Sequence, residues 1–558
     1  MLSDIEISNQ AKLQKIMDIA ALLGLSGDDL DLYGSYMAKV TAPAADEPKG
    51  KLVLVTAITP TPYGEGKTTV SIGLADALRK QGVNAALALR EPSMGPVFGL
   101  KGGACGGGLS QVLPMDKINL HFTGDLHAIT SANNLLCAMI DNSIHQGNPL
   151  NLDPRKVAFR RCMDMNDRQL RHIVDGLGTP KDGMPREDGF DITAASEVMA
   201  VFCLAESLED LKKRLGRIVV GTTYDNREVT CAELGAAGAM TALLKDAFRP
   251  NLVQTLYGTP CLVHGGPFAN IAHGCNSIAA TRLAMSLSDV TITEAGFGAD
   301  LGAEKFIDIA SRTGNFSPDC VVLVATVRAL IWHGLQPGET PDAATPERRM
   351  EALKAGLCNL QRHISNVRDT WKLPVVVALN RFTTDREEEL EAVLQDCEAQ
   401  GVTASLSEAW GKGPDGALDL AEKVMHTLAT VPADTFERTY PLDMPLRDKL
   451  LAVCKKVYRA DDIAISDSAQ KKLDAWQKNG YGDLPVCIAK TQYSFSDDMS
   501  LRGAPEGFTV HIKDVRLSAG AGFIVAFAGD IIAMPGMPKK PAALQVDVQA
   551  DGTIEGLF

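Results

Sequence analysis

The sequence predicts an α/β protein, in which a mostly parallel sheet is flanked by helices and carries a phosphate-binding loop (P-loop). An apolar run at 51–59 ends in a glycine-containing loop. A helical pattern at 67–82 follows at once, and a second apolar run occupies 84–91. Strand, loop, helix and strand within about 40 residues make a βαβ unit, whose two strands run parallel.

Further apolar runs predict more buried strands of the same doubly wound sheet. They lie at 261–265, 290–296, 321–327 and 374–380. Helical patterns separate some of them, at 194–214 and 275–288. The first part of the chain, residues 4–40, is predicted to be mostly helical.

A chain of 558 residues is too long for one ordinary core, so several domains are expected. The segment 333–347 is rich in Pro, Gly and acidic residues and is typical of a linker. We expect a P-loop domain at 1–350 and two smaller α/β domains at 351–460 and 461–558. The last of these has apolar runs at 484–490 and within 508–532 that predict strands.

Composition narrows the class of protein. Hydrophobic residues make up 45% and charged residues 22%, as in soluble globular proteins. The net charge of −14 argues against nucleic acid or an anionic membrane as the main partner. No signal peptide and no membrane-spanning run is evident, and the twelve scattered cysteines are typical of reduced, buried thiols. We therefore expect a cytoplasmic protein.

The loop after the first strand reads "TPYGEGKTT" and has the strand and helix flanks that a P-loop requires. Gly64 and Gly66 would let backbone N–H groups turn inward, and the start of the next helix adds a positive dipole end. Lys67 would reach the β- and γ-phosphates, and the Thr68 hydroxyl would bind Mg²⁺. The alternative is a tight glycine turn with an exposed lysine. The expected ATP site comprises Thr61, Pro62, Tyr63, Gly64, Glu65, Gly66, Lys67, Thr68 and Thr69.

A glycine-rich segment, 95–108, follows the strand that ends in Arg90 and Glu91. Ligands of open α/β sheets bind outside the carboxyl ends of the strands, so Arg90 is a candidate anion clamp, although a surface ion pair is an equal alternative. The titratable residues nearby are candidates for acid–base chemistry, although a lone histidine is more often structural: Lys101, His121, Asp125 and His127.

Several separated motifs together resemble the formate–tetrahydrofolate ligase family, also called formyltetrahydrofolate synthetases. "TPYGEGKTT" matches its P-loop, including Thr61 in place of the usual first glycine. "GLKGGACGGGL" at 99–109 and "VATVRALIWHGL" at 324–335 resemble its two signatures, with departures at Ile331 and Leu335. The segments at 3–8, 294–306 and 484–498 also fit, so the resemblance covers essentially the whole chain.

This resemblance implies a reaction and its ligands. ATP phosphorylates formate to formyl phosphate, and tetrahydrofolate attacks the formyl carbon to give 10-formyltetrahydrofolate. In such an enzyme the 1–350 domain holds nucleotide and formyl phosphate, with Arg90 on formate and Glu91 at a site for K⁺ or NH₄⁺. The 351–460 domain contributes a folate slot, where Phe382 and Trp410 match the family's two stacking aromatics. The resemblance also implies a homotetramer.

Two other functions share some of these features. A P-loop ATPase that acts as a partner-regulated switch has the same strand–loop–helix start, but it predicts neither a folate slot nor the glycine-rich segment. A non-catalytic paralogue would bind nucleotide or folate as a scaffold, and the retained Lys67, Thr68 and Arg90 argue against it.

Overall fold

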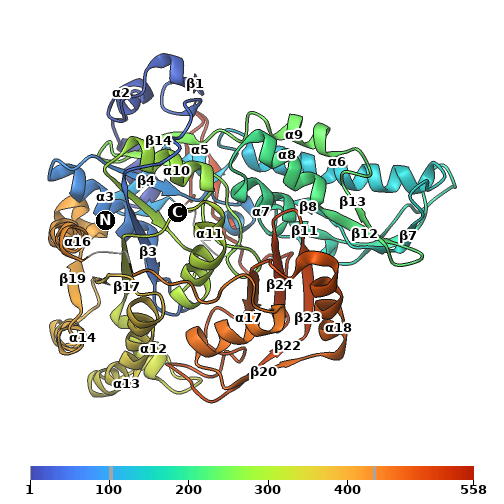
Figure 1. Ribbon diagram of the computed structural model, residues 1–558. Coiled ribbons are helices and arrows are strands. Elements are labelled where there is room, and N and C mark those ends of the chain that lie inside the picture. Colours follow the sequence, from blue (N-terminus) through green and yellow to red (C-terminus); the bar gives the residue numbers. More distant parts are fainter. Residues whose placement is uncertain (1, 100–104, 432–434, 558) are drawn as a thin grey trace.

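The computed structural model describes residues 2–99, 105–431 and 435–557 (Figure 1). The largest sheet of this described part has twelve strands, in the order β1-β2-β14-β15-β4-β16-β3-β17-β18-β19, with β5 and β6 beside the main path. Its strands are β1 (Leu30–Leu32), β2 (Ala38–Val40), β3 (Lys51–Ala57), β4 (Ala85–Leu89), β5 (Gly106–Gly107), β6 (Ser110–Leu113), β14 (Asn251–Thr255), β15 (Pro260–Val263), β16 (Val290–Glu294), β17 (Cys320–Ala325), β18 (Val375–Asn380) and β19 (Thr403–Ser407).

The seven strands from β15 to β19 in this order are parallel, which confirms the predicted mostly parallel sheet. Every strand predicted for this sheet is present. The predicted βαβ unit is also present, but β16 lies between β3 and β4. The carboxyl ends of all seven strands therefore lie at one edge of the sheet, which we call the carboxyl edge.

Helices cover both faces of the sheet, because its central strands are apolar on both sides. On β3, Val53 and Val55 belong to the core beneath α3 and α16, whereas Leu52 and Leu54 belong to the larger core that includes α12 and α13. Figure 1 shows α3 and α16 on one side of the sheet and α12 and α13 on another. These helices are α3 (Lys67–Lys80), α16 (Leu418–Thr430), α12 (Val327–Gly334) and α13 (Pro346–Ser365).

The predicted boundary at residue 350 divides the sheet itself. Strands β18 and β19, which the sequence placed in a separate 351–460 unit, extend the central sheet beyond β17. The helices that flank them are α14 (Glu387–Ala399) and α15 (Ala409–Lys412). The division into domains stays a prediction.

The start of the chain differs from the prediction of mostly helix. Two short helices, α1 (Asp4–Gln10) and α2 (Ile16–Ala21), precede the antiparallel pair β1 and β2. Strand β2 also pairs with β14, and its Ala38 and Val40 fill a small core under α2. Pairing with a distant strand decided the local structure here, and the pattern of 4–40 does not contain that information.

Two further parts surround the central sheet (Figure 1). An arm on the right of the view was not predicted as a unit. It contains α6 (Asp125–His145), α7 (Glu197–Leu204), α8 (Leu208–Arg217), α9 (Ala237–Leu244), β7 (Leu152–Val157), β8 (Arg161–Met163), β9 (Ile173–Asp175), β10 (Arg186–Asp188), β11 (Phe190–Ile192), β12 (Val219–Thr223) and β13 (Glu228–Thr230). The C-terminal part contains α17 (Leu446–Val453), α18 (Asp467–Trp476), β20 (Asp462–Ile465), β21 (Val486–Lys490), β22 (Thr509–Ile512), β23 (Asp514–Ser518) and β24 (Phe523–Ala528).

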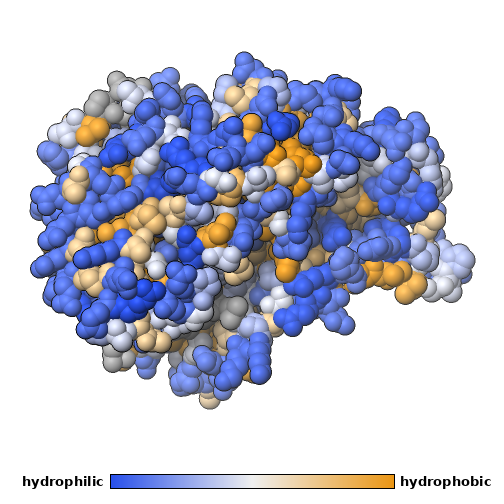
Figure 2. Space-filling model, turned by 90° about the horizontal axis from the view of Figure 1, so that it is seen from below, coloured by the Kyte–Doolittle hydropathy of each residue, from blue (hydrophilic) through white to orange (hydrophobic). Residues whose placement is uncertain are grey.

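The surface seen in Figure 2 is mostly hydrophilic, and its hydrophobic residues form small separate groups. Among the described helices none has the length and apolar character needed to cross a bilayer. All twelve cysteines lie in the described part as free thiols, and eleven are buried.

A buried ion pair joins the arm to the central sheet. The ammonium of Lys39, on β2, lies 2.6 and 2.7 Å from the two carboxylate oxygens of Asp125, the first residue of α6. The two side chains are 2% and 1% exposed. Asn251, on β14, donates a further hydrogen bond of 2.7 Å to Asp125. With both partners desolvated, this pair is costly to break from one side.

Asp125→Asn is expected to lower the free energy of unfolding by about 3–5 kcal/mol, because it leaves the Lys39 charge buried without a carboxylate. Urea denaturation followed by circular dichroism measures the change. Asp31→Asn is the control, since it breaks an exposed ion pair with Arg249 in the same region. Equal shifts of the two midpoints would contradict a special contribution from the buried pair.

Candidate active site

The loop between β3 and α3 is closed by its own side chains. The Glu65 carboxylate accepts hydrogen bonds from the Thr61 backbone N–H at 2.7 Å and from the Thr61 hydroxyl at 3.2 Å. Gly64 and Gly66 have φ of +79° and +75°, which a side chain would strain. A Cβ on Gly66 would also lie 2.4 Å from the Asn380 amide nitrogen. The threonine that replaces the usual first glycine thus has a structural role in the loop.

The start of this loop rests on two helices of the opposite face. The Thr59 carbonyl accepts a hydrogen bond of 2.8 Å from the His333 ring, on α12. Its hydroxyl lies 3.0 Å from the His363 ring and accepts a bond of 3.0 Å from Asn359, both on α13. Ile331 and Leu335, the departures from the family signature, are buried in the core around α12. They leave the His333 contact with the loop intact.

Glu294, the last residue of β16, connects the loop to the neighbouring strand. One carboxylate oxygen accepts a hydrogen bond of 2.8 Å from the Thr68 hydroxyl, and the other lies 3.5 Å from the Arg90 guanidinium. Its side chain is 2% exposed. Sequence reasoning did not select Glu294, although an acid at the end of the buried run "VTITE" was an available signal. The expected Thr68 and Arg90 are therefore joined through a third residue.

Arg90 and Glu91 differ in their surroundings. The Arg90 side chain is 22% exposed, and its Nε has no hydrogen-bond partner among the described residues. Glu91 is buried, and burial, followed by the charge of Asp125, raises the pKa of its carboxyl well above the usual range. One Glu91 oxygen also has no described partner. Both residues thus offer unused polar atoms beside the loop.

Phe382 and Trp410 follow the ends of the adjacent strands β18 and β19, in which Asn380 pairs with Ser407. They are 39% and 37% exposed, which is unusual for large aromatic side chains. The glycine-rich segment lies against Trp410, because the Leu109 N–H donates to the Trp410 carbonyl at 2.8 Å and a Cβ on Gly108 would lie 2.8 Å from the Trp410 ring. Lys101 and the middle of this segment fall outside the described residues.

The predicted acid–base candidates are not gathered around the loop. His121 and His127 are exposed, and neither ring makes a hydrogen bond with another described residue. Asp125 is buried, and its carboxylate is used by Lys39, Asn251 and Thr123. None of the three contacts Thr68, Arg90 or Glu294 among the described side chains.

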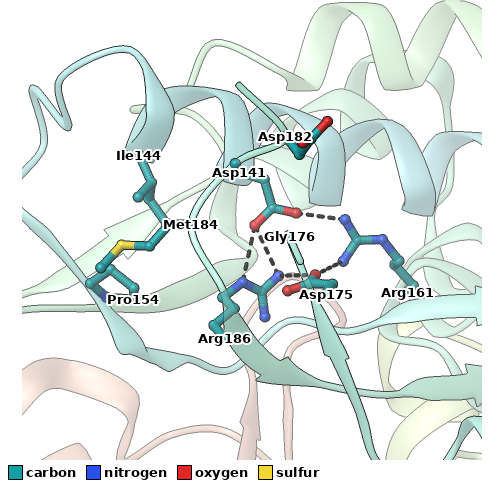
Figure 3. Close-up of a pocket in the computed structure, with 10 residues that line it drawn as sticks. Asp141, Ile144, Pro154, Arg161, Asp175, Gly176, Asp182, Met184 and Arg186 are labelled. Carbon is teal, nitrogen blue, oxygen red and sulfur yellow. Dashed lines mark hydrogen bonds and ion pairs between the residues drawn. The ribbon is translucent and has the colours of Figure 1, made fainter. Parts of the chain in front are cut away.

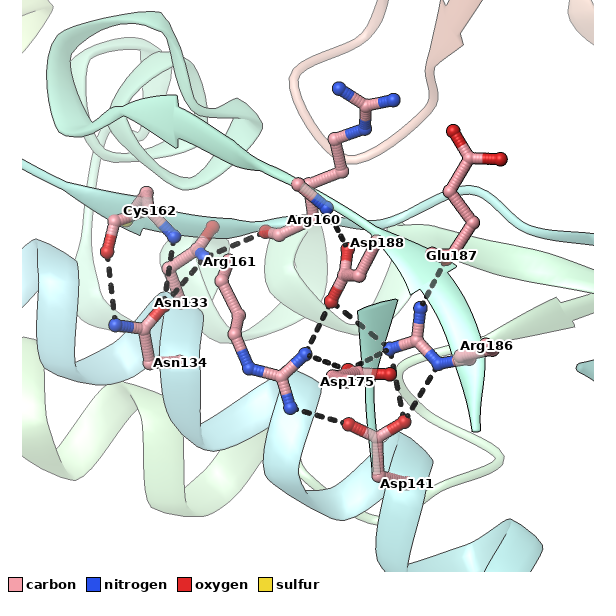
Figure 4. A network of polar contacts seen from close by, with 11 residues as sticks. Asn133, Asn134, Asp141, Arg160, Arg161, Cys162, Asp175, Arg186, Glu187 and Asp188 are labelled. Carbon is pink, nitrogen blue, oxygen red and sulfur yellow. Dashed lines mark hydrogen bonds and ion pairs between the residues drawn. The ribbon is translucent and has the colours of Figure 1, made fainter. Parts of the chain in front are cut away.

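A cavity of about 130 Å³ lies in the arm, away from the carboxyl edge (Figure 3). Its two guanidinium groups, Arg161 and Arg186, are both paired with Asp141, Asp175 and Asp188 (Figure 4). These ion pairs join α6, β8, β9 and β10, so we assign the network to the structure of the arm.

The residues around the loop suit a divalent cation only in part. The described residues include no group of three or more His, Cys, Asp or Glu that could hold a metal ion. The Thr68 hydroxyl and the Glu294 carboxylate are nevertheless oxygen ligands of the kind that Mg²⁺ prefers, and Mg²⁺ usually takes its other ligands from water and phosphates.

Comparison with known proteins identifies the family of the chain. The family model for formate–tetrahydrofolate ligase matches residues 2–558. A formate–tetrahydrofolate ligase of Arthrobacter sp. (strain FB24) is 54% identical over 567 aligned positions, which cover 100% of this chain and 99% of that protein. The chain therefore belongs to the formate–tetrahydrofolate ligase family of enzymes.

Proposed function

We propose that the protein joins formate to tetrahydrofolate at the expense of ATP and does so through formyl phosphate, giving 10-formyltetrahydrofolate, ADP and phosphate. The observation that carries the proposal is the chain of contacts from Thr68 through Glu294 to Arg90. It brings the loop of residues 61–69 close to the Arg90 guanidinium. This proximity supports a nucleotide site beside an anion clamp, as transfer of a phosphoryl group to a small carboxylate requires.

ATP would bind with its phosphates against the loop of residues 61–69 and the start of α3. The backbone N–H groups and Lys67 would hold the β- and γ-phosphates. Thr68 would ligate Mg²⁺ through its hydroxyl oxygen, while Glu294 accepts a hydrogen bond from that hydroxyl and from a neighbouring water. When bound, the metal supplies positive charge to the transferring phosphoryl group.

Arg90 would hold formate for the first step. A formate oxygen attacks the γ-phosphorus, the bond to ADP breaks, and formyl phosphate forms. In the second step the N10 nitrogen of tetrahydrofolate attacks the formyl carbon, phosphate leaves, and the nitrogen loses its proton. His121, His127 and Asp125 remain proposals as acceptors of that proton, and the buried ion pair makes Asp125 the weakest of them.

Tetrahydrofolate would stack between Phe382 and Trp410 at the carboxyl edge. Their exposure and their position on adjacent strand ends support a rim for a flat ring system. Glu91 is proposed at the site of a monovalent cation, K⁺ or NH₄⁺, since its unpartnered buried oxygen could ligate one. We further propose that the enzyme is cytoplasmic and homotetrameric, as the family resemblance implies.

Formation of 10-formyltetrahydrofolate from Mg-ATP, formate, tetrahydrofolate and K⁺ tests the function. The product is read as its methenyl form after acidification, and each substrate is omitted in turn. We expect product only when all three substrates are present. ATP hydrolysis that is indifferent to formate and folate would instead support the switch ATPase.

Glu294→Gln is expected to lower kcat at least tenfold and to raise the Mg²⁺ requirement, because it removes charge between Thr68 and Arg90. Steady-state kinetics at several Mg²⁺ concentrations measures this. Asp319→Asn is the control, because Asp319 lies before β17 at the opposite edge and accepts from the Leu52 N–H. A variant with normal kcat and normal Mg²⁺ dependence would remove Glu294 from the mechanism.

Trp410→Ala is expected to raise the KM for tetrahydrofolate about fivefold or more, the factor that roughly 1 kcal/mol of stacking provides, and to leave the KM for ATP unchanged. Tyr224→Ala removes a similarly exposed aromatic from the arm and serves as the control. An unaltered folate response in Trp410→Ala would place the slot elsewhere.

A further inference from the structure

The loop that follows β15, residues 264–277, is fixed against the end of the Arg90 strand. Its Gly265 carbonyl accepts a hydrogen bond of 2.7 Å from the Glu91 N–H, and its Gly274 carbonyl accepts one of 3.0 Å from the Gly296 N–H. Cys275 also forms an isolated bridge with Ala295, just past β16. The loop therefore packs against the residues that directly follow β4 and β16 at the carboxyl edge.

The side chains of Arg90 and Lys305 both lie near Ala269 of this loop. A Cβ on Gly296 would lie 2.9 Å from an Arg90 guanidinium nitrogen and 2.7 Å from the Ala269 side chain. The Ala269 carbonyl in turn accepts a hydrogen bond of 2.6 Å from the Lys305 ammonium. The two cations thus share one small neighbourhood behind the proposed formate site.

Lys305 is a buried cation without a described carboxylate partner. It is 0% exposed, and the described residues include no ion pair that involves it. The adjacent Glu304 makes no ion pair with it among the described residues, and neither Glu304 oxygen has a described hydrogen-bond partner. Burial and the nearby Asp308 raise the pKa of the Glu304 carboxyl, and the Lys305 charge opposes that shift. A buried cation without an anion is unfavourable.

Two other acids of the same region have cationic partners. Asp300 lies 2.9 Å from Lys490, and both side chains are 0% exposed. Asp308 lies 3.4 Å from Arg312. Glu294 lies beside Arg90, and no carboxylate within ion-pair distance of Lys305 is found among the described residues.

His273 belongs to the same loop and directly precedes Gly274. It is 0% exposed, and both of its ring nitrogens lack a hydrogen-bond partner among the described residues. Burial, and then the charges of Lys305 and Arg90, lower the pKa of the imidazole to about 3. The ring is therefore neutral and keeps one unused N–H donor and one unused acceptor.

We propose that the buried Lys305 ammonium and the neutral His273 ring, with its unused N–H donor, lie behind Arg90 and stabilise a phosphate or acyl-phosphate anion bound there. This inference rests on the proposed function, since formyl phosphate and its product phosphate are the anions concerned. The two residues are positioning residues that act through Arg90. An arriving phosphate dianion relieves the repulsion between Arg90 and Lys305, so the free enzyme is arranged in advance for the charge that develops during the reaction.

The test is titration of inorganic phosphate into the full chain saturated with Mg-ADP, which fills the nucleotide loop, measured by calorimetry. Lys305→Met is expected to weaken phosphate binding at least tenfold with the Kd for Mg-ADP within twofold of wild type. Lys305→Arg is expected to restore most of the affinity. His273→Asn is expected to weaken phosphate binding at least threefold.

Lys449→Met is the matched control. Lys449 is also 0% exposed and donates to two backbone carbonyls, at 2.6 and 2.9 Å, but it lies in the C-terminal part. Its loss is expected to leave phosphate affinity unchanged. If Lys305→Met does not fold, His273→Asn alone decides the question.

The proposal would be overturned if a folded Lys305→Met variant bound phosphate within twofold of wild type. If Lys305→Met does not fold, the same result in His273→Asn would overturn it. Parallel losses of phosphate and Mg-ADP affinity would also overturn it, because they would indicate a purely structural role. Failure of the proposed ligase function gives a different result. In that case the wild-type protein binds phosphate, and Lys305→Met weakens that binding, but no 10-formyltetrahydrofolate forms.

Discussion

The parallel register of the central sheet is the constraint on which the site depends. Because β4, β16 and β3 are adjacent and parallel, their last residues meet at one edge. Ile292 pairs with Val53 on one side and with Leu87 on the other, which brings Glu294 between Thr68 and Arg90. The same edge carries Phe382 and Trp410 at the ends of β18 and β19. The strand order thus places the loop of residues 61–69, Arg90 and two exposed aromatics along the same edge.

Electrostatics at this edge differ from those of the whole protein, which carries a net charge of −14. Lys305 is buried without a described carboxylate, and Arg90 shares a single one, Glu294. An acidic protein can therefore present a locally positive site to anionic substrates. The helices α12 and α13 support the loop, since the His333 ring binds the Thr59 carbonyl and the Asn359 amide binds the Thr59 hydroxyl.

Sequence patterns predicted the strands, the loop and helix α3 well, because buried parallel strands are continuous apolar runs and the loop has local glycine signals. They did not predict strand order, and therefore not the role of Glu294. The local βαβ pattern predicts that β3 lies beside β4. In the structure β16, which follows β4 by about 200 residues in the sequence, lies between them. The arm and the β1–β2 pair were missed for the same reason. Phe382 and Trp410 were selected through family resemblance, and their roles, like that of Arg90, remain proposals.

In the proposed reaction the carboxyl edge brings ATP and formate together, so that a phosphoryl group passes to a formate oxygen before the formyl group passes to folate. The most direct measurement uses formate labelled with ¹⁸O and follows the label by mass spectrometry of the released phosphate. A formyl phosphate intermediate predicts one ¹⁸O atom in phosphate for each 10-formyltetrahydrofolate formed. Unlabelled phosphate in a reaction that still yields 10-formyltetrahydrofolate would contradict it.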